Sequence, residues 1–239
     1  PMSLSDIKPR SLFYGCYVLD FLRFNCFSSW CRDRSIVQRK KGKERSIEEC
    51  ILNIMIKFLP LGGADEIGAS CFYLNIDGTG ILLDCGIHPQ KTKNESLPKF
   101  ELLETETLDF LFISHAHQDH IGALPFLVKK MPYVKIYSTK QTLEIARITL
   151  HNSVKITNEQ LTGTVDEILY NHEDIDLILR SVIEFEYNET KEILGLRHET
   201  NESIKVTFLD AGHILGSASI LIEYQNQRIF YTGDIKISS

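Results

Sequence analysis

The stretch His115-Ala116-His117-Gln118-Asp119-His120 places three histidines and one aspartate within six residues. The apolar run before it, residues 108–114 (LDFLFIS), is typical of a buried strand, and residues 121–130 after it are typical of a helix. Side chains alternate along an extended segment, so His115 and His117 project to one face and could hold one ion together. Imidazole nitrogens and carboxylate oxygens are ligands that zinc prefers, so the stretch predicts a metal centre dense enough for two ions.

A simpler interpretation is a solvated polar loop in which Asp119 caps the helix that follows. Histidine is scarce in this chain, which contains eight, and three of them lie in this one hexapeptide. That concentration favours the metal centre over the capped loop.

Three strand ends outside the hexapeptide each deliver one further metal-competent side chain. They are Asp84 after the apolar strand 80–84, His213 in the glycine-broken loop 210–217 after the strand 205–209, and Asp234 after the second of two strands expected at 218–224 and 227–232. Each residue alone is more often a turn residue. Their joint occurrence at strand ends favours one shared site.

These motifs together resemble the first four motifs of the metallo-β-lactamase superfamily. Flanking stretches resemble its β-CASP branch, a group of nucleases that act on nucleic acids: residues 61–70 (LGGADEIGAS), 83–88 (LDCGIH), 210–218 (DAGHILGSA) and 231–234 (YTGD). The stretch 210–218 is the part that points to the nuclease branch. The resemblance covers residues 55–239 and implies an α/β (α+β) fold, the αβ/βα sandwich, in a zinc-dependent hydrolase of RNA phosphodiester bonds.

The resemblance also implies roles for the site residues and two Zn²⁺ ions as cofactors. His115, His117 and His213 would bind one Zn²⁺, Asp119 and His120 the other, and Asp234 would bridge the two. Asp84 would orient a ligand histidine from behind the metal ligands, which fixes the tautomer of that histidine. Asp84 and Asp119 are the residues to which the resemblance assigns catalytic roles.

The chain ends at Ser239, shortly after the fourth motif. The resemblance places a β-CASP domain, another ligand histidine and the second half of the sandwich beyond that point. We therefore expect an incomplete metallo-β-lactamase domain with a second zinc site short of donors and little activity on its own. We also expect its first sheet to expose an apolar face, which would favour aggregation or a homodimer.

Residues 1–54 have no counterpart in the resemblance, and we expect a poorly ordered extension or an incorrectly assigned start. The basic run 32–45 leaves a nucleic-acid-binding arm as an alternative. Cys26 and Cys31 lack the second short pair that a structural zinc site needs. No stretch reads as a signal peptide or a membrane span, so the expected location is the cytoplasm, without membrane contact.

Charge and the middle of the chain are less informative. Residues 1–50 contain ten of the 26 Lys/Arg residues and six of the 32 Asp/Glu residues. The rest of the chain contains the other sixteen Lys/Arg and twenty-six Asp/Glu, which gives it a net charge of −10. An acidic domain is a poor partner for RNA, or for DNA as an alternative substrate.

Residues 141–203 are mostly helical in pattern, with helices expected at 141–150 and 173–183 and surface histidines at His151, His172 and His198. Cys71 and Cys85 are expected in the core.

Two other functions remain open on the sequence. Thioesterases and lactonases share the His-x-His-x-Asp-His pattern, although the residues after His213 argue against them. A remnant that binds metal without catalysis is the other alternative, and it would take up metal without cleaving a substrate.

Overall fold

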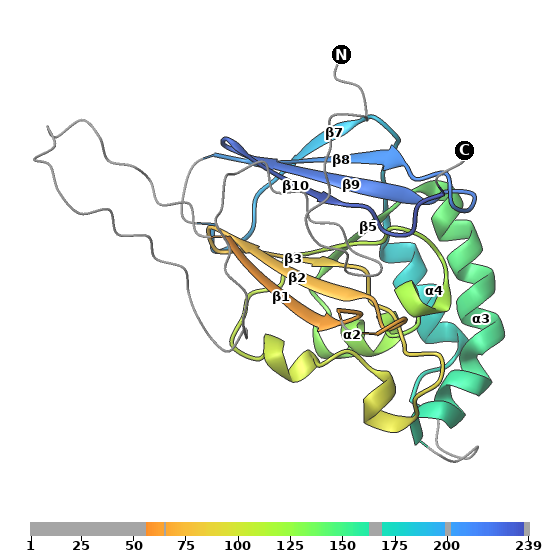
Figure 1. Ribbon diagram of the computed structural model, residues 1–239. Helices are drawn as coiled ribbons and strands as arrows, with labels where there is room; N and C mark the ends of the chain where they lie inside the picture. The colour runs from red at the N-terminus through yellow and green to blue at the C-terminus, as the bar shows by residue number, and fades with distance from the viewer. Residues whose placement is uncertain (1–55, 65, 163–168, 199–201, 237–239) are drawn as a thin grey trace, which may run out of the picture.

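The computed structural model describes residues 56–64, 66–162, 169–198 and 202–236. The expected N-terminal extension 1–54, with its basic run and its cysteine pair, lies outside these residues. Two β-sheets face each other, and helices lie against the far side of the first sheet (Figure 1). This arrangement confirms the α/β sandwich predicted from the sequence.

The first sheet has six strands in the order β1 to β6, and the second has four strands in the order β10-β9-β8-β7. The first contains β1 (Ile56–Gly62), β2 (Cys71–Ile76), β3 (Thr79–Leu83), β4 (Phe110–Phe112), β5 (Lys135–Ser138) and β6 (Ile183–Glu184). The second contains β7 (Thr190–Ile193), β8 (Ile204–Asp210), β9 (Ala218–Tyr224) and β10 (Gln227–Tyr231). The helices are α1 (Gln118–Ile121), α2 (Leu124–Lys130), α3 (Lys140–Thr162) and α4 (His172–Ser181), with short 3₁₀ turns η2 (Lys93–Ser96) and η3 (Phe100–Leu103).

Alternation along the strands of the first sheet fills two separate cores. In β2, Cys71 and Tyr73 face the helices, whereas Phe72 and Leu74 face the second sheet. Cys85 also lies in the helix-side core, so both described cysteines are small core residues, as expected. The sheet is thus covered on both faces.

The core between the sheets corrects one expectation. Phe112 of β4 contacts Phe208 of β8 edge to face, with ring centroids 5.9 Å apart, and Phe185 stacks on Phe208 at 4.3 Å. The expectation that the first sheet exposes an apolar face is wrong, because β7 to β10 lie within the chain and cover that face.

Most predicted elements around the metal motifs are present. The predicted strands appear as β3, β4, β8, β9 and β10, and the helix expected at residues 121–130 appears as α2, while the short helix α1 begins within the hexapeptide. Helix α4 begins with a capping box in which the Asn171 side chain accepts from the backbone of Asp174 and the Asp174 side chain accepts from Asn171.

The helical prediction for the middle segment is wrong after Ser181. Residues 183–184 and 190–193 form β6 and β7 instead. Thr190 pairs with Thr207 of β8 through hydroxyls 2.7 Å apart, and buried Ile193 lies opposite Ile204. Cross-strand pairing with a distant segment overrides the local pattern here.

Within the part of the chain that the structure describes, none of the helices combines the length and the apolar character that a membrane span needs.

Candidate metal centre

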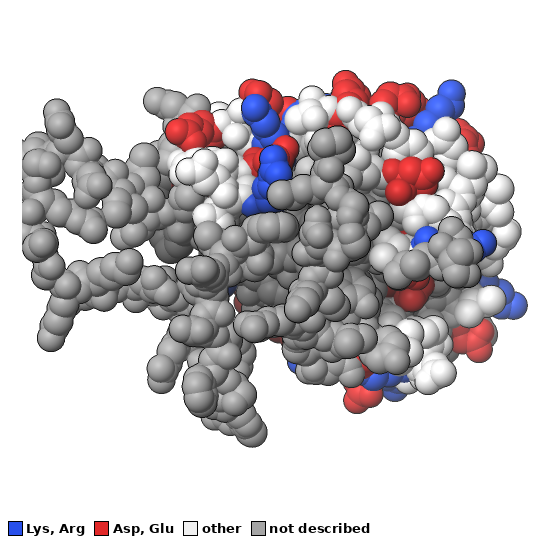
Figure 2. Space-filling model, turned by 45° about the horizontal axis from the view of Figure 1, so that its top comes forward, with Lys and Arg blue, Asp and Glu red and all other residues white. Residues whose placement is uncertain are grey.

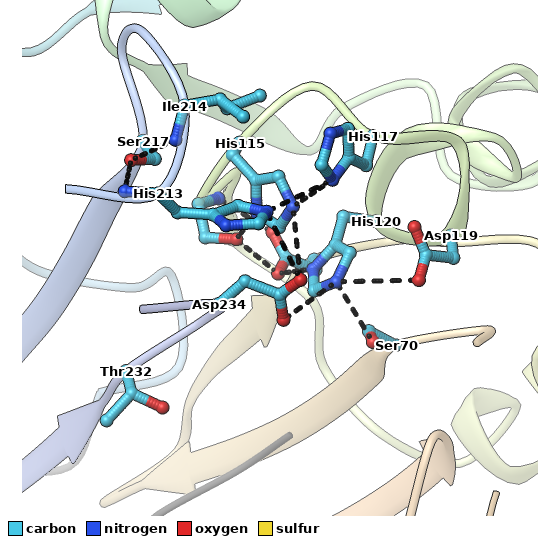
Figure 3. A network of polar contacts seen from close by, with 12 residues as sticks. Ser70, His115, His117, Asp119, His120, His213, Ile214, Ser217, Thr232 and Asp234 are labelled. Atoms are coloured by element: carbon cyan, nitrogen blue, oxygen red, sulfur yellow. Dashed lines mark hydrogen bonds and ion pairs between the residues drawn. The ribbon is translucent and has the colours of Figure 1, made fainter. Parts of the chain in front are cut away.

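Four histidines and two aspartates from separate elements point toward one region at the edge of the two sheets (Figure 3). His115 and His117 lie in the loop after β4, and Asp119 and His120 lie on α1. His213 lies in the loop between β8 and β9, and Asp234 follows β10. The structure therefore brings together the side chains that the sequence singled out from distant segments.

The turn that carries Asp119 and His120 is fixed onto the end of β3 by close backbone packing. Cys85 N–H donates to the His120 carbonyl at 2.8 Å, and Ser70 N–H donates to the Asp119 carbonyl at 2.9 Å. A Cβ at Gly86 would lie 1.6 Å from the same Asp119 oxygen. Only glycine permits this approach, so Gly86 determines where the ligand turn lies.

The loop that carries His213 is held by hydroxyl groups. Ser217 Oγ accepts from the backbone N–H groups of His213 at 3.1 Å and Ile214 at 3.2 Å. The Gly216 carbonyl accepts from the hydroxyls of Thr139 at 2.7 Å and Thr142 at 2.8 Å, at the start of α3. These bonds fix the direction of the His213 side chain.

One donor group consists of His115, His117, His213 and Asp234, whose ligand atoms lie within 4.8 Å of one another. His117 Nδ1 lies 3.1 Å from His115 Nε2 and 3.3 Å from His213 Nε2. Asp234 Oδ2 lies 3.7 Å from His115 Nε2 and 3.5 Å from His213 Nε2. These four atoms surround a space that a single metal ion could share.

Asp119, His120 and the other oxygen of Asp234 form a looser group beside the first. His120 Nε2 lies 3.5 Å from Asp234 Oδ1 and 3.9 Å from Asp119 Oδ2. Asp234 thus faces the first group with Oδ2 and the second with Oδ1. The hydroxyl of Ser70, 3.4 Å from the same His120 nitrogen, completes this side.

Asp84 lies fully buried beneath the centre and accepts several hydrogen bonds. It receives Ser114 N–H on Oδ1 at 2.7 Å, and its Oδ2 receives the hydroxyls of Ser114 at 2.6 Å and Tyr231 at 2.5 Å. His120 Nδ1 contacts that same oxygen at 2.7 Å. An ionised carboxylate only accepts, so Nδ1 of His120 carries the proton and its Nε2 lone pair faces the metal region.

A second grouping of ligand atoms, Asp84, His115 and His120, also lies within 4.8 Å, and all three residues are buried. Its carboxylate is already surrounded by the donors of Ser114, Tyr231 and His120. The group around Asp234 is therefore the better candidate for a metal, and Asp84 acts on it through His120.

Burial and neighbouring charges set the protonation of the histidines. Burial first, then the charge of His120, lowers the pKa of His115 to about 3. Burial and the charge of His213 also lower the pKa of His117. Both imidazoles are neutral near pH 7, which is the form that binds a metal.

His120 differs from its neighbours in its protonation. Burial by itself lowers the pKa of His120, but the charge and hydrogen bond of Asp84 outweigh it and raise the pKa. In the same pair, burial would raise the pKa of Asp84, and the charge of His120 lowers it. Asp84 therefore stabilises the charged imidazole of His120, which must release the proton on Nε2 before that nitrogen can bind a metal.

Two residues in this network were not singled out by the sequence. Tyr231 ends β10 with its hydroxyl on Asp84, and Ser114 ends the run before the hexapeptide. Each could have been suggested by its position, immediately before a ligand segment at a strand end.

The remaining histidines lie outside this network. His88 is buried in the loop after β3, where Nδ1 accepts from the backbone of Gln90 and Lys91, both at 3.2 Å. His198 contacts the hydroxyl of Thr79 at 2.8 Å. His151 and His172 lie at the surface, as expected, and their Nδ1 atoms lie 2.8 Å apart where α3 meets α4.

Comparison with known proteins agrees with this geometry. Residues 73–238 match the family described as a metallo-beta-lactamase superfamily domain. Cleavage and polyadenylation specificity factor 73 of Drosophila melanogaster is 34% identical over 181 residues, which is 75% of this chain and 25% of that protein. Endoribonuclease YSH1 of Saccharomyces cerevisiae is 34% identical over 183 residues, 74% of this chain and 22% of that protein. The chain therefore spans about a quarter of the length of these relatives, and they bear out the resemblance to the nuclease branch.

Proposed function

Because this chain belongs to the metallo-β-lactamase superfamily, we propose that it carries the metal-binding part of a zinc-dependent phosphodiesterase that cleaves RNA. The observation that carries the proposal is the convergence of four histidines and two aspartates on one region. The name of the matched yeast protein, endoribonuclease YSH1, supports RNA as the substrate and internal cleavage as the reaction.

The spacing of the donor atoms suits zinc at the first group. Atoms bound to one tetrahedral zinc at about 2.0–2.1 Å lie roughly 3.3 Å apart. The four donors of the first group are separated by 3.1 to 3.7 Å along the contacts that join them. We assign His115, His117, His213 and Asp234 to this ion.

The second ion would take Asp119, His120 and the other oxygen of Asp234. Their separations of 3.5 and 3.9 Å are wider than in the first group, and the described residues add only the Ser70 hydroxyl there. We therefore propose that the second ion binds more weakly. When bound, two zinc ions would polarise the phosphoryl group and lower the pKa of water to supply the nucleophile.

The residues around the centre have separate tasks. Asp84 holds the His120 tautomer, and the burial of His115 and His120 excludes water from the inner side. Asp234, His213 and Asp119 are about one third exposed, at 36, 27 and 30% of their side chains, so the substrate would approach from their side. Asp119 lies there as a carboxylate that can accept a proton from an attacking water.

Surface charge gives little support to tight RNA binding by this part of the chain. Figure 2 shows Lys and Arg lying beside Asp and Glu on the described surface in view, rather than gathered into a basic patch. Phosphate recognition would therefore depend on the metal ions, each of which adds about two positive charges. The free thiols of Cys71 and Cys85 support a reducing compartment such as the cytoplasm.

The test is metal-dependent cleavage by the purified chain, loaded with zinc, of single-stranded RNA and of DNA of the same sequence. We expect slow RNA cleavage that EDTA abolishes and that Asp119→Asn reduces by at least about a hundredfold. Hydrolysis of thioesters or lactones in place of RNA would support the small-molecule alternative. Zinc uptake without any turnover at high protein concentration would support a remnant that only binds metal.

A further inference from the structure

Helix α3 contacts both of the segments that carry metal ligands from distant parts of the chain. Near its start, the hydroxyl of Thr142 donates to a backbone carbonyl of the His213 loop at 2.8 Å. Near its end, the hydroxyl of Thr157 accepts from Gln118 Nε2 at 3.2 Å, next to the ligand Asp119. The helix extends along one side of both sheets (Figure 1). One element therefore supports both ligand segments.

The two threonines occupy nearly the same face of α3. They are fifteen positions apart, which is about four turns of helix and roughly 22 Å along its axis. The side chains of Thr142 and Thr157 are both buried. Because the helix between them is continuous, it keeps the two hydroxyls at a constant separation.

Gln118 connects the ligand turn to two elements. It is the first residue of α1 and lies between the ligands His117 and Asp119. Its backbone carbonyl accepts from Ile87 N–H at 3.2 Å, in the loop after β3. Its side chain reaches Thr157 on α3. The turn is thus held both by the loop after β3 and by α3.

The hydrogen bond to Thr157 explains why a polar side chain stands at this position. Gln118 Oε1 is buried and has no hydrogen-bond partner within the described part of the chain. Methionine, an apolar side chain of similar length, would avoid the cost of burying that oxygen. It would also lose the bond from Nε2 to Thr157, which gives the turn a defined direction.

The second ion would depend on this bond more than the first. Asp119, His120 and Asp234 supply the second ion, whereas the first ion has three histidines beside Asp234. Asp119 Oδ2 lies 3.9 Å from His120 Nε2, and the Asp119 side chain is 30% exposed. The position of this carboxylate therefore follows the position of the turn that carries it.

We propose that Thr157 is a positioning residue for the second zinc ion and acts on Asp119 through Gln118. The inference rests on the proposed two-zinc centre and adds a part of the chain that contacts no metal. Thr142 has the corresponding position at the other end of α3, beside the His213 loop. Loss of the Thr157 hydroxyl should therefore weaken one ion selectively.

The test is calorimetric zinc titration of the purified chain and of Thr157→Val, with urea unfolding in EDTA to establish that each protein folds. We expect two zinc ions of different affinity in the unmodified chain. Thr157→Val should weaken the second ion about tenfold and the first by less than about twofold. Thr157→Ser keeps the hydroxyl and should restore the second ion.

Two further variants test the route through Gln118. Gln118→Met should weaken the second ion as Thr157→Val does, and the double variant should be no weaker than either single variant. Thr142→Val, the same change at the other end of α3, should spare the second ion. In the metal-free protein, the NMR signals of the Gln118 side-chain amide should shift in Thr157→Val.

The outcomes separate this inference from the proposed function. Equal zinc affinities in the unmodified chain and in folded Thr157→Val, or equal weakening of both ions, would overturn the role of Thr157 and leave the proposed metal centre standing. Additive effects of Gln118→Met and Thr157→Val would overturn the route through Gln118. Binding of no zinc by the unmodified chain would overturn the metal centre and this inference together.

Discussion

The inner and outer halves of the metal centre are held in different ways. The inner half, around Asp84, His120, Ser114 and Tyr231, is joined by hydrogen bonds of 2.5 to 2.7 Å and is buried. The outer half, formed by His117, Asp119, His213 and Asp234, is partly exposed, and its contacts span 3.1 to 3.9 Å.

This difference separates folding from metal binding. The inner contacts satisfy one another without an ion, because Asp84 accepts from every donor around it. The outer donor atoms contact one another at 3.1 to 3.9 Å, and a bound cation would join them. Inner substitutions should therefore change the stability of the metal-free protein, and outer substitutions should change metal affinity.

Asp84→Ala is expected to have the largest effect on the metal-free protein. It leaves the buried His120 without its charged partner and two hydroxyls without an acceptor, at a cost of about 3–5 kcal/mol in unfolding free energy. Urea unfolding in EDTA measures it. A loss below about 1 kcal/mol would show that the inner half does not support the fold.

Acidification is expected to destabilise the metal-free protein. The pKa of His115 is about 3 in the folded protein and near 6.5 in the unfolded chain. Between these pH values the unfolded chain binds a proton that the folded protein does not bind, so falling pH favours unfolding. The raised pKa of His120 has the opposite effect. The stabilisation that comes from protonated His120 is present at low pH and is lost as pH rises through the folded pKa of His120.

Urea midpoints between pH 6.5 and about 5.5 test this above the range in which most carboxylates titrate. We expect the midpoint to fall with pH and to fall less steeply in His115→Gln. The same slope in both proteins would contradict the assignment of the effect to His115.

Tyr231→Phe should have a smaller effect of the same kind. It removes the 2.5 Å hydrogen bond to Asp84 and should cost about 1–3 kcal/mol in unfolding free energy. Because Asp84 orients His120, zinc affinity should also fall by about 10–100-fold. Tyr133→Phe is the matched control, since Tyr133 is 92% exposed. Equal effects of the two variants would remove Tyr231 from the network.

Asp234→Asn should barely change the metal-free protein, by less than about 0.5 kcal/mol, because its side chain is partly exposed. It should nevertheless lower the zinc occupancy of both sites, because the two oxygens of Asp234 face different donor groups. Calorimetric zinc titration beside urea unfolding measures both. A large loss of stability without loss of zinc binding would reverse the roles of the two halves.

Sequence reasoning reached the outer half more easily than the inner half. His117, Asp119, His213 and Asp234 stand in short motifs at strand ends, and a metal site needs those residue types. Tyr231 and Ser114 have no such chemical signature, and their contact with Asp84 depends on how the two sheets pack. The sequence therefore identified the donors, and the resemblance implied that Asp84 orients one of them, but the hydrogen bonds that Ser114 and Tyr231 make to Asp84 were not predicted.

The fold shows a similar division. Strands with clear alternation, such as β8 and β9, were predicted, but β7 was missed because it depends on pairing with β8. The covering of the first sheet by the second was missed for the same reason, since no local pattern reports contacts between distant segments. The pairing of His151 with His172 likewise follows only from the packing of α3 against α4.

Anomalous diffraction at the zinc edge, from crystals of the chain grown with zinc, tests the centre most directly. We predict a peak bounded by His115 Nε2, His117 Nδ1, His213 Nε2 and Asp234 Oδ2, with a weaker one between Asp119, His120 and Asp234 Oδ1. A peak among the buried atoms of Asp84, His115 and His120, or no peak at any of these donors, would contradict the proposed metal centre.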